Sequence, residues 1–478
     1  MSARVRFAPS PTGEIHIGSV RTILYNYLFA KQNGGTLILR IEDTDQERYD
    51  ARSLPSIYDG LRWLGIGWDE GPREGGPYAP YVQSERLATY QEHAKRLVDG
   101  GNAYPCFCSK ERLDAMRASQ QARKEITRYD GLCRKIDPKE AAERATREPH
   151  TIRLKVPDEG TIAVEDLVHG HVQWPLEVIE DQVLLKSDGF PTYQLAVIVD
   201  DHLMEISHVL RGEEWLASTP KHLLVYRAFG WEVPPHGHFP SVLGADGKKL
   251  SKRHGSTRLS EFRELGFLPE ALVNYLALVG WAPGTEDEVF SMDDLIQRWR
   301  IDQVQKAGGK WDYERLKWFN GIWIRRLSHD ELCQRVLPFL PEEWDRGVVR
   351  AAIPFIQERM QTLVEAKDLI AFLFQEASLD AASLLPKGRT ADQARDGLAR
   401  VRAAISSGSF EHGEIEAALK KVAEDLGWKQ GDVNMAVRLA VTGTRVGPPI
   451  YESVELLGRE RALARLDRAI GTLGARPP

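Results

Sequence analysis

Two short segments, far apart in the chain, carry residues suited to phosphate chemistry. His16-Ile17-Gly18-Ser19 opens an expected helix, and Lys248–His254 follow the turn Gly244–Gly247. A helix start offers N–H groups and positive dipole charge to an anion, and glycine lets a ligand approach the backbone. Loop cations can neutralise charge on departing pyrophosphate. Each segment alone also fits a surface histidine beside a cap or a solvated basic loop. Together they predict a nucleotide site in which His16 donates a hydrogen bond to a phosphate oxygen and the loop cations meet the departing pyrophosphate.

The elements that must position these groups form a βαβ unit. Residues 4–8 read as a strand, the helical spacing of apolar residues runs from 16 to 32, and residues 36–41 form a second apolar run. Strand, helix and strand in about forty residues require a parallel sheet. Ligands of such sheets lie at the carboxyl ends of the strands. We therefore expect residues 8–18 and 42–45 to surround one crevice.

Two arginines end expected strands at the same crevice. Arg6 lies in the first strand, and Arg211 follows the apolar run 206–210. A guanidinium in a dry site is costly unless an acidic partner meets it. The crevice is therefore expected to bring carboxylates, from the protein or from a ligand, to both arginines.

The composition bounds the remaining possibilities. The 478 residues carry 63 Lys and Arg against 69 Asp and Glu, for a net charge of −6, which excludes a histone-like basic protein. Any nucleic acid must meet local basic patches. No apolar run reaches the ~18 residues of a membrane span, so no membrane partner is expected. Four cysteines do not make a disulfide scaffold, and we expect a reducing, cytoplasmic location.

These motifs carry a resemblance to a known family. In His16–Ser19 and Lys249–Arg253 the chain resembles the HIGH and KMSKS motifs of class I aminoacyl-tRNA synthetases. Within that class it is similar, over essentially its whole length, to the bacterial glutamyl-tRNA synthetases. The further matching stretches are Arg6–Gly13, Arg40–Asp45, Pro191–Tyr193, Val199–Leu203 and Val209–Trp215.

The resemblance implies an α/β fold with a Rossmann-like parallel-sheet catalytic domain, an inserted α+β subdomain and an all-α anticodon-binding region. The implied segments are residues 1–100 and 191–255 for the catalytic domain, 101–190 for an acceptor-stem insertion, 256–322 for a helical stem-contact region, and 323–380 and 381–478 for two parts of the anticodon-binding domain.

The implied activity is that of a glutamate–tRNA ligase, which activates L-glutamate with ATP and Mg²⁺ and transfers it to tRNA(Glu). A monomer is expected. Two alternatives stay open: a form that also charges tRNA(Gln) with glutamate, and a non-catalytic tRNA-binding paralogue, which the intact motifs disfavour. By resemblance, the ATP-binding residues are His16, Gly18, Ser19, Glu214, Trp215, Lys249 and Lys252.

The resemblance also implies a glutamate pocket of Arg6, Ala8, Ser10, Glu42, Tyr193 and Arg211. Arg6 is expected to meet the side-chain carboxylate and Arg211 to complete the binding, whereas Glu42 and Ser10 match positions that hold the α-amino group. A carboxylate offers two acceptors to donor-only arginines, and glutamine would turn an NH₂ toward a donor. The other interpretation of Glu42 is an ion pair with Arg40. Some relatives carry Asn where this chain has Val197, which leaves the contact set open.

Two further sites follow from the resemblance. Cys106, Cys108, Tyr129 and Cys133 resemble a structural zinc site of the family, and the other interpretation is a set of reduced cysteines without metal. Arg359 resembles an arginine that reads the third anticodon base in enzymes that reject tRNA(Gln). The other interpretation is that Arg359 lies on a solvent-exposed face of a helix and has no binding role.

Overall fold

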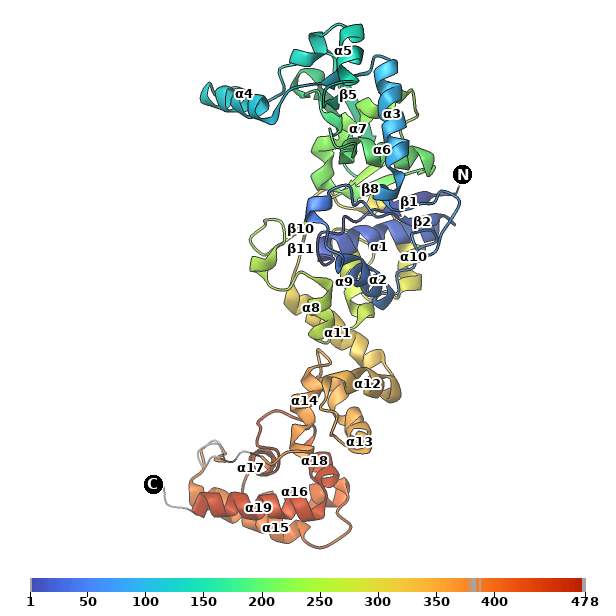
Figure 1. Ribbon diagram of the computed structural model, residues 1–478. Helices are drawn as coiled ribbons and strands as arrows, with labels where there is room; N and C mark the ends of the chain where they lie inside the picture. Colours follow the sequence, from blue (N-terminus) through green and yellow to red (C-terminus); the bar gives the residue numbers. More distant parts are fainter. Residues whose placement is uncertain (1, 378, 380–383, 387, 475–478) are drawn as a thin grey trace. The chain divides into compact units, whose positions relative to one another are not determined.

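The computed structural model describes residues 2–377, 379, 384–386 and 388–474 (Figure 1). The chain folds into two compact units, Met1–Glu261 with Leu272–Asp312, and Phe262–Ala271 with Tyr313–Pro478. The expected segment boundary between residues 380 and 381 lies outside the described residues. The six-segment division remains a prediction.

A parallel sheet forms the centre of the first unit. Strand β1 (Arg4–Phe7) pairs in parallel with β2 (Thr36–Leu39), and β8 (Val209–Gly212) pairs in parallel with β9 (His236–Phe239). The backbone N–H of Ser207 donates to the carbonyl of Arg4 at 2.9 Å, which joins the two pairs edge to edge. The expected βαβ unit is confirmed, with β1 and β8 ending at one edge.

Helix α1 (Ile17–Gln32) connects β1 to β2. Its residues Val20, Ile23, Leu24 and Leu28 are fully buried, which is why the helical spacing of apolar residues predicted it. Further helices of this unit are α2 (Ser53–Trp63), α3 (Leu87–Asp99), α6 (Tyr193–Leu203), α7 (Thr219–Phe229) and α10 (Met292–Arg298). Two short strands, β10 (Val242–Leu243) and β11 (Gly309–Lys310), pair beside the basic loop.

The expected α+β insertion is confirmed. Strands β3 (Ala103–Cys106), β4 (Thr151–Leu154) and β7 (Val183–Leu185) form an antiparallel sheet, flanked by α4 (Lys110–Ala122) and α5 (Pro138–Ala145). Strands β5 (Thr161–Asp166) and β6 (Gly170–Pro175) form a hairpin. The last residue of β5, Asp166, pairs with His236 of β9, so the hairpin extends the catalytic sheet.

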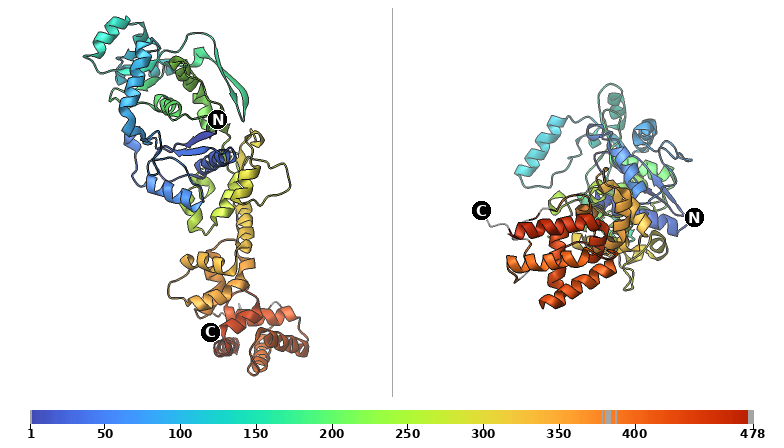
Figure 2. Two further views of the ribbon diagram at one scale, coloured as in Figure 1. Left: turned by 90° about the vertical axis from the view of Figure 1, so that its right-hand side faces the viewer. Right: turned by 90° about the horizontal axis from the view of Figure 1, so that it is seen from below.

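The second unit is helical in its described part. Its helices after residue 312 are α11 (Tyr313–Arg326), α12 (His329–Val336), α13 (Arg346–Ile356), α14 (Glu365–Ile370), α15 (Ala391–Ile405), α16 (His412–Leu426), α17 (Gln430–Thr442), α18 (Ile450–Leu457) and α19 (Arg459–Gly474). Figure 2 shows α15, α16 and α19 packed side by side. The side chain of Asn320 accepts the backbone N–H of Leu268 at 2.7 Å, which ties residues 262–271 to this unit.

Two helices lead from one unit to the other along the chain, α8 (Leu259–Glu264) and α9 (Pro269–Leu278). Among the described residues, no helix has both the length and the apolar character that crossing a membrane requires.

Candidate active site

A pocket of ≈ 360 Å³ lies where β1 and β8 end and α1 begins. The parallel topology places it there, because side chains from both strand ends and from the helix start face the same crevice. Of the predicted site residues, it is lined by Arg6, Ala8, Ser10, His16, Ser19, Glu42, Tyr193, Arg211, Glu214 and Trp215. Gly18, Lys249 and Lys252 do not line it.

His16 is the N-cap of α1, and its ring orientation fixes what it can do. The backbone N–H of Gly18 donates to Nδ1 of His16 at 3.1 Å. In the neutral ring the proton therefore lies on Nε2, which is left as a hydrogen-bond donor. Burial, with the nearby charge of Lys249, lowers the pKa of His16. A neutral ring that donates from Nε2 suits a phosphate oxygen.

The expectation of free backbone N–H groups at this helix start is wrong for two residues. The N–H of Ile17 donates to the carbonyl of Thr257 at 2.9 Å, and that of Gly18 is bonded to His16. The cause is that the chain after the basic loop folds back, with Arg258 bridged to His16. An anion would thus meet the His16 ring and the residues after Gly18.

The basic loop approaches this pocket through one of its two predicted lysines. Nζ of Lys249 lies 3.9 Å from Glu214, which lines the pocket. Lys252 begins a short turn of 3₁₀ helix and is exposed. The side chain of Arg253 donates to Asp246 at 3.1 Å within the loop. Lys249 therefore lies next to a residue of the pocket, whereas Lys252 is exposed on the loop and does not line the pocket.

Arg6 has an acidic partner that the sequence reasoning missed. Its Nε and one terminal nitrogen donate to the two carboxylate oxygens of Asp201 at 3.0 and 3.2 Å. Asp201, at the end of α6, is also buried, and Arg40 donates to it at 2.8 Å. The adjacent acidic pair after an apolar run, Asp200 and Asp201, was the available signal. Arg6 thus lines the pocket with its charge already paired.

Glu42 combines both interpretations that the sequence left open. Arg40 donates to Oε1 of Glu42 at 3.0 Å, so the expected ion pair exists. Glu42 is nevertheless buried and lines the pocket, so it is not a surface acid. Burial raises the pKa of Glu42, although Arg40 and Arg6 oppose the shift.

Arg211 differs from Arg6, because it contacts no carboxylate among the residues that the structure describes. Its Nε donates to Nε2 of His238 at 3.0 Å, and its terminal nitrogens contact His222 and Thr219 at 3.0 and 3.1 Å. Tyr193, 3.4 Å away, completes the shell. All these partners are neutral, and Arg211 is only 5% exposed. A buried cation whose hydrogen-bond partners are all neutral favours the binding of an anion.

An aromatic wall closes the same pocket. The rings of Tyr193 and Trp215 lie 4.3 Å apart, between centroids, at 30°. Both residues line the pocket with Glu214. Apolar rings beside a cation and a carboxylate allow a small zwitterion and a flat heterocycle to bind together.

The predicted metal ligands converge in the insertion. The sulfurs of Cys106, Cys108 and Cys133 lie within 4.8 Å of one another, and Oη of Tyr129 lies 3.5 and 3.6 Å from those of Cys106 and Cys108. Tetrahedral zinc with bonds of about 2.3 Å needs sulfurs roughly 3.8 Å apart. Arg153 and the backbone N–H of Phe107 also point donors at the sulfurs. The donor set fits structural zinc.

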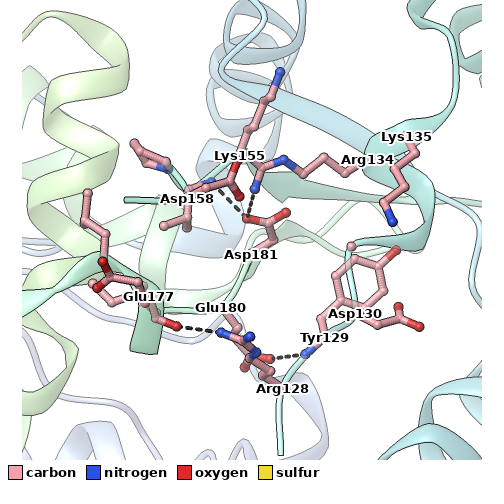
Figure 3. A pocket seen from close by; sticks show the side chains of 15 residues that line it. Arg128, Tyr129, Asp130, Arg134, Lys135, Lys155, Asp158, Glu177, Glu180 and Asp181 are labelled. Atoms are coloured by element: carbon pink, nitrogen blue, oxygen red, sulfur yellow. Dashed lines mark hydrogen bonds and ion pairs between the residues drawn. The ribbon is translucent and has the colours of Figure 1, made fainter. Parts of the chain in front are cut away.

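A second pocket, of ≈ 660 Å³, lies beside this cluster (Figure 3). Its labelled side chains mix both charges: Arg134 points at Asp181, 3.5 Å away, and Arg128 donates to the carbonyl of Glu177 at 2.6 Å. Of the predicted site residues it contains only Tyr129. Its mixed lining lacks the unpaired buried cation that marks the smaller pocket.

Arg359 lies in a short 3₁₀ turn after α13 and is exposed. Burial, and after it the nearby charge of Arg359, lowers the pKa of Arg438 on α17. Arg359 and Arg438 thus form a small basic patch that could contact a phosphate or a base edge of a nucleic acid.

A parallel-sheet crevice that joins a helix-capping histidine, an unpaired buried arginine and a cationic loop is typical of an enzyme that binds a nucleotide and a small anion. Comparison with known proteins agrees. A family model described as class I tRNA synthetases (E and Q), catalytic domain, matches residues 2–318, and an anticodon binding domain model matches residues 331–470.

Relatives match over nearly the full length. A glutamate–tRNA ligase of Dehalococcoides mccartyi is 45% identical and one of Treponema denticola is 42% identical, with at least 98% of each chain covered. The crystal structure of a glutamate tRNA ligase from Elizabethkingia meningosepticum, in complex with its amino acid, is 36% identical with a TM-score of 0.91, over 99% of this chain and 100% of that one. The chain belongs to the class I tRNA synthetases of the E and Q family.

Proposed function

We propose that this protein is a glutamate–tRNA ligase. The observation that carries the proposal is Arg211, a buried guanidinium whose described partners are all neutral, in the pocket that His16 and Glu42 also line. Full-length similarity to glutamate–tRNA ligases supports the same activity.

The first step joins glutamate to AMP. An oxygen of the α-carboxylate attacks the α-phosphorus of ATP, the bond to the bridging oxygen breaks, and pyrophosphate leaves. Mg²⁺, when bound with ATP, would supply positive charge to the phosphates. The residues proposed to bind ATP are His16, Gly18, Ser19, Glu214, Trp215, Lys249 and Lys252. His16 would donate from Nε2 to a phosphate oxygen, and the two lysines would neutralise charge on the departing group. The second step transfers the glutamyl group to a hydroxyl of the terminal tRNA ribose and releases AMP.

The amino acid is proposed to bind among Arg6, Ala8, Ser10, Glu42, Tyr193 and Arg211. Glu42 supplies negative charge for the α-ammonium group. The charge of Arg6 is paired with Asp201, whereas no described carboxylate contacts Arg211. Arg211 therefore favours an anionic ligand, and the carboxylate of glutamate would pair with it. Glutamine would bring a neutral amide whose NH₂ faces a donor.

We propose that the helical unit reads the anticodon of tRNA(Glu), with Arg359 at the third base. The match of residues 331–470 to an anticodon binding domain supports this role, as does the neighbouring cation Arg438. A tRNA(Gln)-rejecting form is favoured over a relaxed one, because Arg359 is present and exposed.

Cys106, Cys108, Tyr129 and Cys133 would hold a zinc ion that fixes the insertion. When bound, zinc would supply structural cross-linking between β3 and the turn at Cys133, and no reaction step involves it. A cytoplasmic, monomeric enzyme without a membrane partner completes the proposal.

Aminoacylation with purified tRNA(Glu) and tRNA(Gln) tests the proposal. We expect glutamate, and not glutamine, to be esterified to tRNA(Glu), with pyrophosphate exchange followed in the presence and absence of tRNA. Equal use of glutamine would contradict the substrate, and comparable charging of tRNA(Gln) would contradict the role of Arg359. Exchange at near wild-type rates in His16→Ala or Lys252→Ala would remove those residues from the phosphate site.

A further inference from the structure

We propose that Asp166 and His238 form a positioning pair that holds Arg211 in its substrate-binding orientation without neutralising its charge. The inference rests on the proposed function, because it deepens the role of Arg211 as the anion receptor of the amino acid pocket. The pair joins Asp166 of the insertion hairpin to His238 of the catalytic sheet.

The contacts of the His238 ring define which of its nitrogens donates a hydrogen bond and which accepts one. Nδ1 of His238 lies 2.6 Å from Oδ2 of Asp166, and Nε2 lies 3.0 Å from Nε of Arg211. Because Nε of Arg211 is always a donor, Nε2 of His238 must be the acceptor. The ring proton therefore lies on Nδ1 and faces Asp166. Both side chains are fully buried, so water does not compete for these atoms.

Asp166 is held in the ionised state that this arrangement needs. Its Oδ1 accepts the backbone N–H groups of Val168 and His169, each at 3.0 Å. These bonds and that of His238 outweigh burial and lower the pKa of Asp166 to about 2. The pairing of β5 with β9 places this carboxylate beside His238. A carboxylate that fixes the tautomer of a histidine is a general way to orient the group beyond it.

The remaining contacts of Arg211 show what the pair leaves free. Nη1 faces His222 at 3.0 Å and Tyr193 at 3.4 Å, and Nη2 faces Thr219 at 3.1 Å. Of the five N–H groups of the guanidinium, one on Nη2 has no partner among the described residues. Arg6 is neutralised by direct contact with Asp201, whereas the carboxylate behind Arg211 stands one imidazole away. Arg211 thus keeps both a fixed orientation and an uncancelled charge for the ligand.

Asp166→Asn tests the pair most directly, because asparagine has the same shape as aspartate but no negative charge. The amide can turn its NH₂ toward Nδ1 of His238 and stabilise the tautomer with a proton on Nε2, which then opposes the N–H of Arg211. We expect KM for glutamate to rise roughly 10- to 100-fold. KM for ATP stays within about twofold, since Arg211, the residue that the pair orients, is not among the residues proposed to bind ATP.

Asp181→Asn is the matched control. Asp181 is a buried carboxylate of the same insertion, drawn in Figure 3. It accepts the hydroxyl of Tyr104 and the backbone N–H of Val156 and has no hydrogen bond to Arg211. It is expected to change stability without changing KM for glutamate. His238→Gln keeps an acceptor oxygen for Arg211, so its KM for glutamate should rise less than that of His238→Leu.

The readout that a purely structural role would not change is the tautomer of His238. In ¹⁵N-histidine NMR spectra the wild-type protein should show His238 protonated on Nδ1, a signal assigned by its loss in His238→Gln, and Asp166→Asn should show Nε2 protonated. An unchanged KM for glutamate in Asp166→Asn, or an equal rise in both KM values, would overturn the pair. A wild-type enzyme that does not charge tRNA with glutamate would instead refute the proposed function, and the NMR result would still decide the tautomer.

Discussion

At the scale of single residues, two arginines that look equivalent in the sequence play different parts. Both are buried and line one pocket. Arg6 is paired with Asp201 in a two-point contact, whereas Arg211 is surrounded by neutral donors and acceptors. The charge available to a ligand therefore resides on Arg211, and Glu42 supplies the opposite charge nearby.

The raised pKa of Glu42 predicts a pH dependence of glutamate binding. As the pH falls through this raised pKa, above the ordinary value of about 4.3, Glu42 is protonated and loses its attraction for the α-ammonium group. KM for glutamate should rise as the pH is lowered from neutrality through this raised pKa, measured by exchange with tRNA present. In Glu42→Gln we expect KM to be high and flat over that range. A wild-type KM that stays constant would contradict the role of Glu42.

At the scale of elements, a single side chain at the start of α1 both caps the helix and faces the ligand. Nδ1 of His16 caps the helix, and Nε2 remains for the ligand. Likewise, β5 ends in the carboxylate that lies behind Arg211. The residue at one end of each element thus contributes to the pocket, His16 by lining it and Asp166 by supporting Arg211 through His238.

The two uses of His16 are separable by substitution. His16→Asn keeps an oxygen that accepts the N–H of Gly18, so it should retain most of the cap, worth about 1 kcal/mol. Its amide is too short to replace Nε2, so the exchange rate should still fall on the order of 10²–10³. His16→Ala should lose both. Thermal unfolding and pyrophosphate exchange distinguish the two effects, and a fully active Asn variant would refute the donor role.

The thiol cluster predicts dependence of the insertion on zinc. Removing the metal leaves three thiols and a buried phenol without the ion that joins β3 to the turn at Cys133. We expect about one equivalent of zinc in the purified protein, and faster proteolysis between residues 107 and 133 after chelation. Cys106→Ser should behave like the chelated protein, whereas Cys333→Ser, at a buried cysteine of α12, should not. Protein that contains no zinc would refute the site.

At the scale of the whole molecule, the chain forms two compact units. The first contains the parallel sheet, the pocket and the insertion, and the second contains the helices from α11 onward. Residues 262–271 belong to the second unit although the chain returns to the first after them. Catalysis and anticodon reading are thus assigned to separately packed units.

Separate units predict separate unfolding. We expect two transitions in differential scanning calorimetry, one for each unit. ATP and glutamate should raise only the midpoint of the unit with the parallel sheet, since a ligand at 100 times its Kd adds about 2.7 kcal/mol to the stability of the part that binds it. The anticodon unit serves as the internal control. A single transition that moves as a whole would show that the units unfold together.

Much of the fold follows from local patterns in the sequence. Helical spacing after His16 predicts α1, two apolar runs predict β1 and β2, and the βαβ rule then places Arg6, His16 and Glu42 at one crevice. These inferences succeed because helix and strand periodicity are properties of neighbouring residues. Four of the α1 positions that the spacing marks, Val20, Ile23, Leu24 and Leu28, are fully buried, whereas the fifth, Tyr27, is half-buried.

The sequence by itself determined the class of fold, the family and most of the predicted residues that meet in the pocket. Only the tertiary structure decided how their charges are arranged. Asp201 meets Arg6 across 195 positions of the chain, and Asp166 meets His238 across 72. Such pairings depend on strand register and on which buried groups need a partner, and no periodicity records them. For that reason the sequence showed two arginines, and the fold showed which one awaits an anion.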